Sequence, residues 1–168
     1  MECEDPVIRE IIQKAALSLE PMPTTINGEA SLWGLYHCEK YDQNNTEPRF
    51  EPAYAPEGYY YERSADVRDR WTFYGRVSAC SYSNFQILFN TACELGYNGP
   101  PLALDKDDMA VEYVCRYIRR RIIEKGAIKP EHIADAYNSG TFKDDIIPSA
   151  YIRKFMRYYE RALRKQCQ

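Results

Sequence analysis

Histidine is scarce in this chain: only His37 and His132 occur among the 168 residues, in different segments. They lack the spacing of metal ligands, which argues against a zinc site. The six cysteines form no CxxC pair and are too few for a disulfide scaffold at this length, so we expect reduced thiols. We therefore predict neither a metal ion nor another cofactor.

The chain also lacks long apolar runs and an excess of positive charge. No stretch is apolar for long enough to span a bilayer. The acidic segment Met1–Val7 has no apolar core of the kind that a secretory signal needs. The formal net charge is −3, so the chain as a whole lacks the excess of positive charge that is typical of nucleic-acid-binding proteins. These absences predict no membrane span, no signal peptide and no nucleic acid partner.

Three segments space their apolar side chains as one face of an α-helix does. The pattern i, i+3, i+4, i+7, i+11 runs from Ile8 to Leu19, from Val111 to Ile122 and from Ile152 to Leu163. An apolar stripe with charges outside predicts a helix that packs against a core. Shorter helices are predicted from Asn84 to Leu95 and from Pro130 to Tyr137. The length of the chain suits one compact domain.

The most apolar helical run is Ala30–Glu39, with Asn27 as its expected N-cap and Glu29 in its first turn. It is apolar almost all round, as is typical of a helix at the centre of an α-domain. A carboxyl group at the end of such a segment loses water, which raises its pKa, and a carboxylic acid that keeps its proton can act as a general acid. The simpler alternative is that Glu39 ends the helix in solvent, as most glutamates do.

Residues 41–77 are rich in Tyr, Pro, Glu and Arg and lack sustained periodicity. We expect a long loop or a small strand region here, with short strands at Tyr59–Glu62 and Trp71–Tyr74. The aromatic side chains could stack on sugar rings, but for any single tyrosine packing within a small satellite core is the favoured interpretation. The fold class is therefore mainly α, a single helical domain with this one irregular region.

Three short motifs follow one another along the chain. They are HisCysGluLys (37–40), SerTyrSerAsnPheGlnIle (81–87) followed by ThrAlaCysGluLeuGlyTyr (91–97), and AlaAspAlaTyrAsnSerGly (134–140). In this order they resemble the lytic transglycosylase and goose-type lysozyme-like domain. In that family a Glu ending a buried helix precedes Ser-x-Gly-Leu-Met/Phe-Gln-Ile, Thr-Ala-x-x-Leu-Gly and Ala-Tyr-Asn-x-Gly segments. ArgPheGluPro at 49–52 is similar to an element of phage-type members. The resemblance covers roughly Ser31 to Leu163 and implies an α+β lysozyme-like transglycosylase domain, which we expect to occupy residues 1–168 as a single domain.

The resemblance also implies an activity, the cleavage of the β-1,4 bond between N-acetylmuramic acid and N-acetylglucosamine in peptidoglycan. Glu39 matches the catalytic acid and base of the family. Ser81 and Gln86 match residues that line the cleft. Tyr137 matches the tyrosine that holds the catalytic carboxyl, and Asn138 matches a residue that binds the substrate. Members of the family rely mostly on one Glu, assisted by the N-acetyl oxygen of the substrate. Both a lytic transglycosylase and a muramidase fit this pattern.

Two further carboxylates are candidates near these motifs. Most glycosidases use a pair of carboxyl groups, and Asp42 and Glu51 are the candidates for a second one. For Glu51 an ion pair with the nearby Arg49 is the favoured interpretation.

Several motif residues also have purely structural explanations. Ser83 and Gln86 fit the Ser-x-x-Gln pattern of a capping box at a helix start. For Gln86 this interpretation and the substrate-binding one stand side by side. The segment Tyr137–Gly140 could end a helix, since Asn and Gly are common there. Ser81 could be an ordinary loop hydroxyl.

The chain departs from the family pattern at two places, and each motivates an alternative. Lys40 follows Glu39 where the family has Ser, and Ser83-Asn84 stand where it has Gly-Leu. These changes motivate a catalytically inactive glycan-binding protein or a structural component of a phage particle. A helical adaptor that uses the basic face at Arg116–Arg121 is a third possibility. We expect a place in a phage virion or the host cytoplasm, with peptidoglycan strands and other virion proteins as partners.

Overall fold

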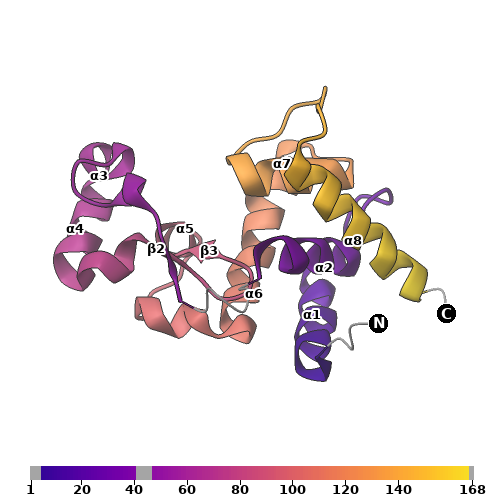
Figure 1. Cartoon of the computed structure of the whole chain (residues 1–168), viewed down its shortest axis with the longest axis horizontal. Helices are drawn as coiled ribbons and strands as arrows, with labels where there is room; N and C mark the ends of the chain where they lie inside the picture. Colours follow the sequence, from indigo (N-terminus) through magenta and orange to yellow (C-terminus); the bar gives the residue numbers. More distant parts are fainter. Residues whose placement is uncertain (1–4, 41–46, 167–168) are drawn as a thin grey trace. The chain divides into compact units, whose positions relative to one another are not determined.

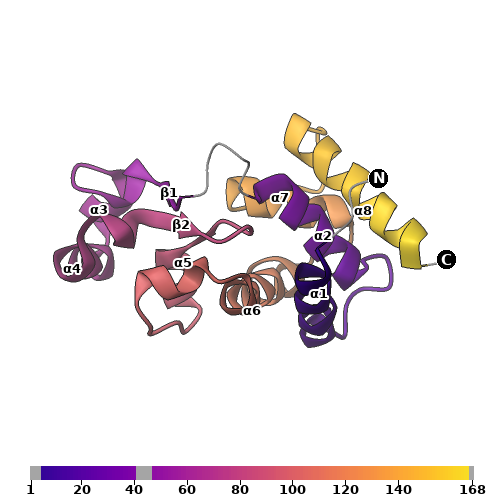
Figure 2. The ribbon, with the colours of Figure 1, turned by 60° about the horizontal axis from the view of Figure 1, so that its bottom comes forward.

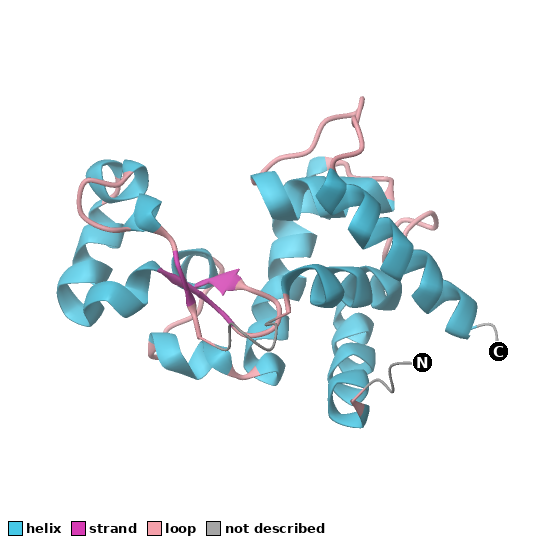
Figure 3. Ribbon diagram, viewed as in Figure 1, coloured by secondary structure: helices cyan, strands magenta, loops and turns pink. Residues whose placement is uncertain are grey.

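The structure is a computed structural model that describes residues 5–40 and 47–166. It is mainly helical, as the sequence predicted, and it contains one small antiparallel sheet of three strands (Figure 3). The chain divides into two compact units. The first unit comprises Met1–Glu39 and Val114–Gln168, and the second comprises Lys40–Tyr113.

The first unit is built from helices (Figures 1 and 2). They are α1 (Pro6–Leu19), α2 (Gly28–Glu39), the end of α6 (Asp107–Tyr117) with its continuations η4 (Ile118–Ile122) and η5 (Ile123–Lys125), α7 (Pro130–Ser139) and α8 (Ala150–Gln166). All three predicted amphipathic helices are therefore confirmed, and the predicted helix at Pro130 ends two residues later than expected. Gly140 follows α7 with φ of 85°, so the structural interpretation of this segment as a helix end is confirmed.

The central helix of the first unit is α2, and its start agrees with the prediction. Asn27 Oδ1 accepts a hydrogen bond from the backbone N–H of Ala30 at 2.8 Å, which is an N-cap, and Glu29 lies in the first turn. The side chains from Ala30 to Leu35 are buried on all sides of the helix. Both α1 and α8 pack against α2. This confirms an apolar helix at the centre of a helical unit.

Helix α8 runs antiparallel to α2, and a glycine allows their close approach. Tyr151 at the start of α8 contacts Glu39 at the end of α2, whereas Tyr159 contacts Asn27 at the start of α2. A Cβ atom on Gly34 would lie 2.6 Å from the ring of Phe155. Glycine inside a helix costs about 0.5–1 kcal/mol relative to alanine. The contact with Phe155 explains why it is nevertheless present in α2.

We expect Gly34→Ala to destabilise the protein, although alanine is the better helix former. The added methyl group would push the Phe155 ring away from α2, and overpacking of this kind costs about 1–3 kcal/mol. Urea denaturation of the two proteins measures the difference. In a Phe155→Leu background the cost of Gly34→Ala should shrink, because the smaller side chain leaves room. An equal cost in both backgrounds would contradict the contact as the cause.

The second unit contains the sheet and short helical segments. Its elements are β1 (Arg49–Phe50), η1 (Pro52–Tyr54), α3 (Tyr59–Arg63), α4 (Ala65–Tyr74), η2 (Gly75–Ala79), β2 (Cys80–Tyr82), β3 (Ile87–Leu88), α5 (Phe89–Glu94), η3 (Pro101–Asp105) and the start of α6. The strands lie in the order β1-β2-β3, and Ser81 in the middle strand pairs with Arg49 on one side and Leu88 on the other.

The predicted strands at Tyr59–Glu62 and Trp71–Tyr74 are wrong, because these residues lie in α3 and α4. Ser64 Oγ accepts from the backbone N–H of Val67 and so caps α4. Arg68 then donates to the carbonyl oxygens of Tyr61 and Glu62, both at 3.0 Å, which ties α4 to α3. Contacts between these two neighbouring helices therefore stabilise the segment, whereas a strand would need backbone hydrogen bonds to another strand.

The aromatic side chains of this region contact one another. Tyr54 stacks on Tyr60 with ring centroids 4.5 Å apart, and Tyr61 meets Trp71 edge to face at 6.2 Å. Tyr60 is nevertheless 46% exposed, so this cluster of rings lies at the surface of the second unit. The rings form a partly exposed cluster rather than a buried satellite core.

The predicted helix from Asn84 to Leu95 is wrong in its first half. Residues 83–86 form the turn of a hairpin that joins β2 to β3, and only Phe89–Glu94 is helical. Its end is as expected: Gly96 has φ of 99°, its N–H donates to Cys93, and the N–H of Tyr97 donates to Ala92. Because no helix starts at Ser83, the capping-box interpretation is also wrong.

Candidate functional site

Glu39 ends α2 in the first unit, where its carboxyl group is half-buried. The hydroxyl of Tyr151, in the first turn of α8, donates a hydrogen bond to Glu39 Oε1 at 2.5 Å. The two residues are separated by 112 positions in the sequence. The carboxyl group is therefore held by a side chain from a second helix rather than left in solvent, which was the simpler alternative for Glu39.

The Tyr151 hydroxyl is the donor in its hydrogen bond with Glu39. Burial raises the pKa of Tyr151 far above its usual range, and the negative charge of Glu39 and the hydrogen bond to it raise this pKa further. The hydroxyl is therefore protonated near neutral pH. A neutral donor of this kind orients a carboxyl group in either of its protonation states.

The backbone at the end of α2 is bound by a cation from α8. Lys154 Nζ donates to the carbonyl oxygen of Cys38 at 3.2 Å. A cation is favourable here, because the last carbonyl groups of a helix carry partial negative charge. Burial raises the pKa of the Cys38 thiol to about 12, with Lys154 and Arg157 opposing and Glu39 adding to the shift. The Cys38 thiol is therefore protonated near neutral pH and is a poor nucleophile.

Tyr137 and Asn138, which the motif comparison assigns to the same site, lie on α7 of the first unit. Tyr137 is half-buried and meets Tyr117 edge to face with centroids 5.7 Å apart, and Asn138 is exposed. Tyr137 also contributes to the raised pKa of Tyr151. The roles predicted for Tyr137 and Asn138 stay predictions.

The sequence reasoning missed Tyr151. A signal was present, because Tyr151 lies four residues before Phe155 and eight before Tyr159, on the face of α8 that packs inward. A tyrosine on such a face buries its ring and needs a partner for its hydroxyl. Which residue supplies that partner could not be read from the spacing.

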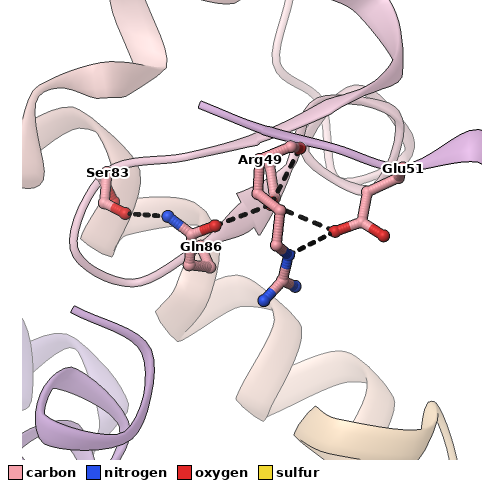
Figure 4. Close-up of polar contacts among 5 residues, drawn as sticks. Arg49, Glu51, Ser83 and Gln86 are labelled. Atoms are coloured by element: carbon pink, nitrogen blue, oxygen red, sulfur yellow. Dashed lines mark hydrogen bonds and ion pairs between the residues drawn. The ribbon is translucent and has the colours of Figure 1, made fainter. Parts of the chain in front are cut away.

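The second unit gathers another set of the predicted residues around its sheet (Figure 4). Arg49 Nε lies 2.7 Å from Glu51 Oε1, which confirms the predicted ion pair. Ser81 Oγ donates to Gln86 Oε1 at 2.9 Å, and Gln86 Nε2 donates to the carbonyl oxygen of Ser83 at 2.8 Å. Ser81 and Gln86 are 1% and 8% exposed. Both polar atoms of the Gln86 side chain therefore have partners inside the hairpin.

The hairpin turn that contains Ser83 and Asn84 is held by hydrogen bonds to two aspartates. Ser83 has φ of 65° and Gln86 has φ of 50°, in the left-handed region that favours glycine. The N–H of Ser83 donates to Asp105 Oδ1 at 3.2 Å. Asn84 donates to Asp107 through both its backbone and its side-chain nitrogen, at 2.9 and 2.8 Å. Two aspartates thus hold the turn in a conformation that a glycine would adopt without strain.

We expect Ser83→Gly to be more stable than Ser83→Ala by about 1 kcal/mol. Both changes remove the hydrogen bond that Ser83 Oγ accepts from the N–H of Phe85 at 3.0 Å. Only glycine removes the strain of the left-handed conformation, which costs about 1–2 kcal/mol for a residue with a Cβ atom. Thermal unfolding of the two variants measures the difference. An alanine variant as stable as the glycine variant would show that the turn is not strained.

The predicted residues thus form two groups, one in each unit. Glu39, Tyr137 and Asn138 belong to the first unit, and Ser81, Gln86 and Glu51 belong to the second. Lys40, directly after Glu39, has an exposed side chain. Asp42, the other candidate for a second carboxylate, lies outside the described residues.

Comparisons with known proteins give no further assignment. No family model matches the chain, and neither a curated protein nor a solved structure shows significant similarity to it. Within residues 5–40 and 47–166, no helix has the length and apolar character needed to cross a bilayer. The same residues contain no group of three or more His, Cys, Asp or Glu side chains that could hold a metal ion.

Proposed function

We propose that this protein cleaves the β-1,4 bond between N-acetylmuramic acid and N-acetylglucosamine in peptidoglycan, as a lytic transglycosylase or a muramidase. The observation that carries the proposal is the 2.5 Å hydrogen bond from Tyr151 to Glu39 at the end of α2. A general acid must be held in a fixed orientation toward the bond that it protonates. The motif order, from HisCysGluLys to AlaAspAlaTyrAsnSerGly, supplies the substrate class.

In this proposal Glu39 performs both proton transfers. As an acid it gives its proton to the glycosidic oxygen of the leaving sugar, and as a base it then accepts a proton from the attacking hydroxyl. The N-acetyl oxygen of the substrate assists at the anomeric carbon. A mechanism with a single carboxylate is supported by the pairing of Glu51 with Arg49, a partly exposed ion pair of the second unit.

The attacking group decides which of the two activities is present. Attack by the 6-hydroxyl of the muramic acid gives a 1,6-anhydro sugar, whereas attack by water gives a reducing end. Mass spectrometry of the products from purified peptidoglycan distinguishes them, because the anhydro product is lighter by one water. We expect muropeptides of one of these two kinds. Digestion that releases no muropeptides would overturn the proposed activity.

The hairpin of the second unit favours a second candidate function, a catalytically inactive glycan-binding or structural component of a phage particle. Ser81 and Gln86, which would contact sugar in an active enzyme, are buried and hydrogen-bonded to each other. This candidate predicts retention of the protein on insoluble peptidoglycan with no soluble product. The digestion that tests the enzyme therefore also tests this alternative.

A further inference from the structure

Helix α8 concentrates positive charge in a chain that is acidic overall. Its 17 residues include six Lys or Arg and one Glu, a formal net charge of +5. Because the whole chain carries −3, the remaining residues carry −8. The basic residues are Arg153, Lys154, Arg157, Arg161, Arg164 and Lys165. Such a contrast on one helix indicates a surface that attracts anionic partners.

Four of these cations follow one another along the helix surface. Arg153, Arg157, Arg161 and Lys165 are spaced by four residues, so each is a neighbour of the next on α8. At 1.5 Å per residue this row is about 18 Å long. We call these four residues the α8 row. The opposite face of α8, including Ile152, Phe155 and Tyr159, is buried in the first unit.

The α8 row begins near Glu39 and ends at a pocket. Arg153, the first residue of the row, lies between Tyr151 and Lys154, which contact Glu39 and the carbonyl oxygen of Cys38. At the other end, Lys165 lines a pocket of about 320 Å³ formed by α1, α2 and α8 within the first unit. Trp33 and Glu29 of α2 also line this pocket.

The lining of the pocket is chemically mixed. Besides Lys165 it contains the guanidinium of Arg9, the amides of Gln13 and Gln166, and the carboxylate of Glu29. Cations and amides suit carboxylates and peptide groups, and the carboxylate suits an ammonium group. A polymer of phosphates would meet repulsion from Glu29. A peptide with both carboxylates and amino groups would find a partner for each.

We propose that the α8 row and the pocket bind the peptide stems of peptidoglycan, so that a glycan strand lies along α8 with Glu39 near one end. This proposal rests on the proposed function, because it names how the same first unit holds its polymeric substrate. The stems carry the carboxylates that the α8 row complements. Insertion into a lipid surface is disfavoured, because the apolar face of α8 is already buried in the core.

The test compares two variants with the same change in charge. Arg157→Gln with Lys165→Gln removes two exposed cations of the α8 row, and Arg120→Gln with Lys125→Gln removes two exposed cations elsewhere in the first unit. Binding is measured by sedimentation with purified insoluble peptidoglycan, using proteins of equal unfolding temperature. We expect affinity to fall by about tenfold or more in the first variant and by less than about twofold in the second.

A chemical control identifies the group that is bound. Peptidoglycan whose carboxylates have been converted to amides should bind the wild-type protein as weakly as the α8-row variant binds native peptidoglycan. Equal binding of native and amidated material would overturn the proposal, as would equal losses in the two variants. Competition by double-stranded DNA but not by soluble muropeptides would assign the surface to nucleic acid and would also overturn it.

The outcome is separable from that of the proposed function. Bound protein is measured in the pellet, whereas cleavage is measured as soluble product. If no product forms but the α8-row variant binds more weakly than its control, the activity fails and the binding surface stands. If product forms at the wild-type rate and both variants bind equally, the activity stands and the binding surface fails.

Discussion

Glu39→Gln should reduce the release of muropeptides from purified peptidoglycan by about 10²–10⁴-fold, the usual contribution of a general acid and base. Glutamine has no proton to give to the glycosidic oxygen and cannot accept one from the attacking hydroxyl. Its amide oxygen can still accept the hydrogen bond from Tyr151, so the end of α2 should remain in place. The rate of soluble product formation measures the effect, and thermal unfolding checks that the fold is intact.

Glu51→Gln is the matched control for this experiment. Its carboxylate is about 30% exposed and its partner Arg49 about 54% exposed, and such surface pairs contribute little to stability. If Glu39 is the acid and Glu51 only an ion-pair partner, Glu51→Gln should leave most of the activity. A loss as large as that of Glu39→Gln would instead make Glu51 a second catalytic carboxylate. Equal product release by wild type and Glu39→Gln would refute the assignment of Glu39.

Tyr151→Phe should lower kcat by about 10- to 100-fold with little change in KM, because a hydrogen bond to a charged group contributes about 1.5–3 kcal/mol. The variant removes the donor that holds Glu39 but keeps the half-buried ring. Tyr151 is a positioning residue in the proposed mechanism, so its loss affects the chemical step more than the binding of substrate. Kinetics on soluble glycan fragments separate kcat from KM.

Tyr159→Phe provides a control on the same helix. The Tyr159 hydroxyl accepts a hydrogen bond from the N–H of Asn27 at 2.8 Å, at the opposite end of α2. Its removal should lower the unfolding temperature and leave kcat unchanged. Tyr137→Phe tests the tyrosine that the motif comparison favours. Wild-type kcat in Tyr151→Phe together with a low kcat in Tyr137→Phe would reverse the roles assigned to these two hydroxyls.

Local chemistry explains why much of the first unit was predictable. The apolar periodicity of α1 and α8, the Asn27 cap of α2 and the glycine after α7 depend on residues within a few positions of one another. In the second unit, the Arg49–Glu51 pair is equally local: Glu51 directly follows β1 in an extended conformation, and residues two apart in an extended segment point to the same side. Such features are encoded in short windows of sequence.

The errors fall in the second unit, where contacts between neighbouring segments decide the element that forms and the composition of the segment does not. Tyr59–Glu62 has the composition of a strand but lies in helix α3. The Arg68 side chain, from α4, donates hydrogen bonds to the carbonyl oxygens of Tyr61 and Glu62 in this helix. The segment at Ser83 looks like a helix start but turns into a hairpin, since Ser81 and Tyr82 pair with Leu88 and Ile87. Asp105, 22 residues further along, holds the N–H of Ser83. The contacts of Asp105 and Asp107 with the hairpin turn span 22 and 23 residues, so they are not visible in a short window of sequence.

The sequence by itself determined that Glu39 ends a buried helix, because the apolar run and its cap are local features. Only the tertiary structure decided which side chain holds that carboxyl group. The antiparallel packing of α8 on α2 brings Tyr151 to Glu39, and it depends on the contact between Gly34 and Phe155. A hydrogen bond across 112 residues follows from the register of two helices, which no spacing within either helix specifies.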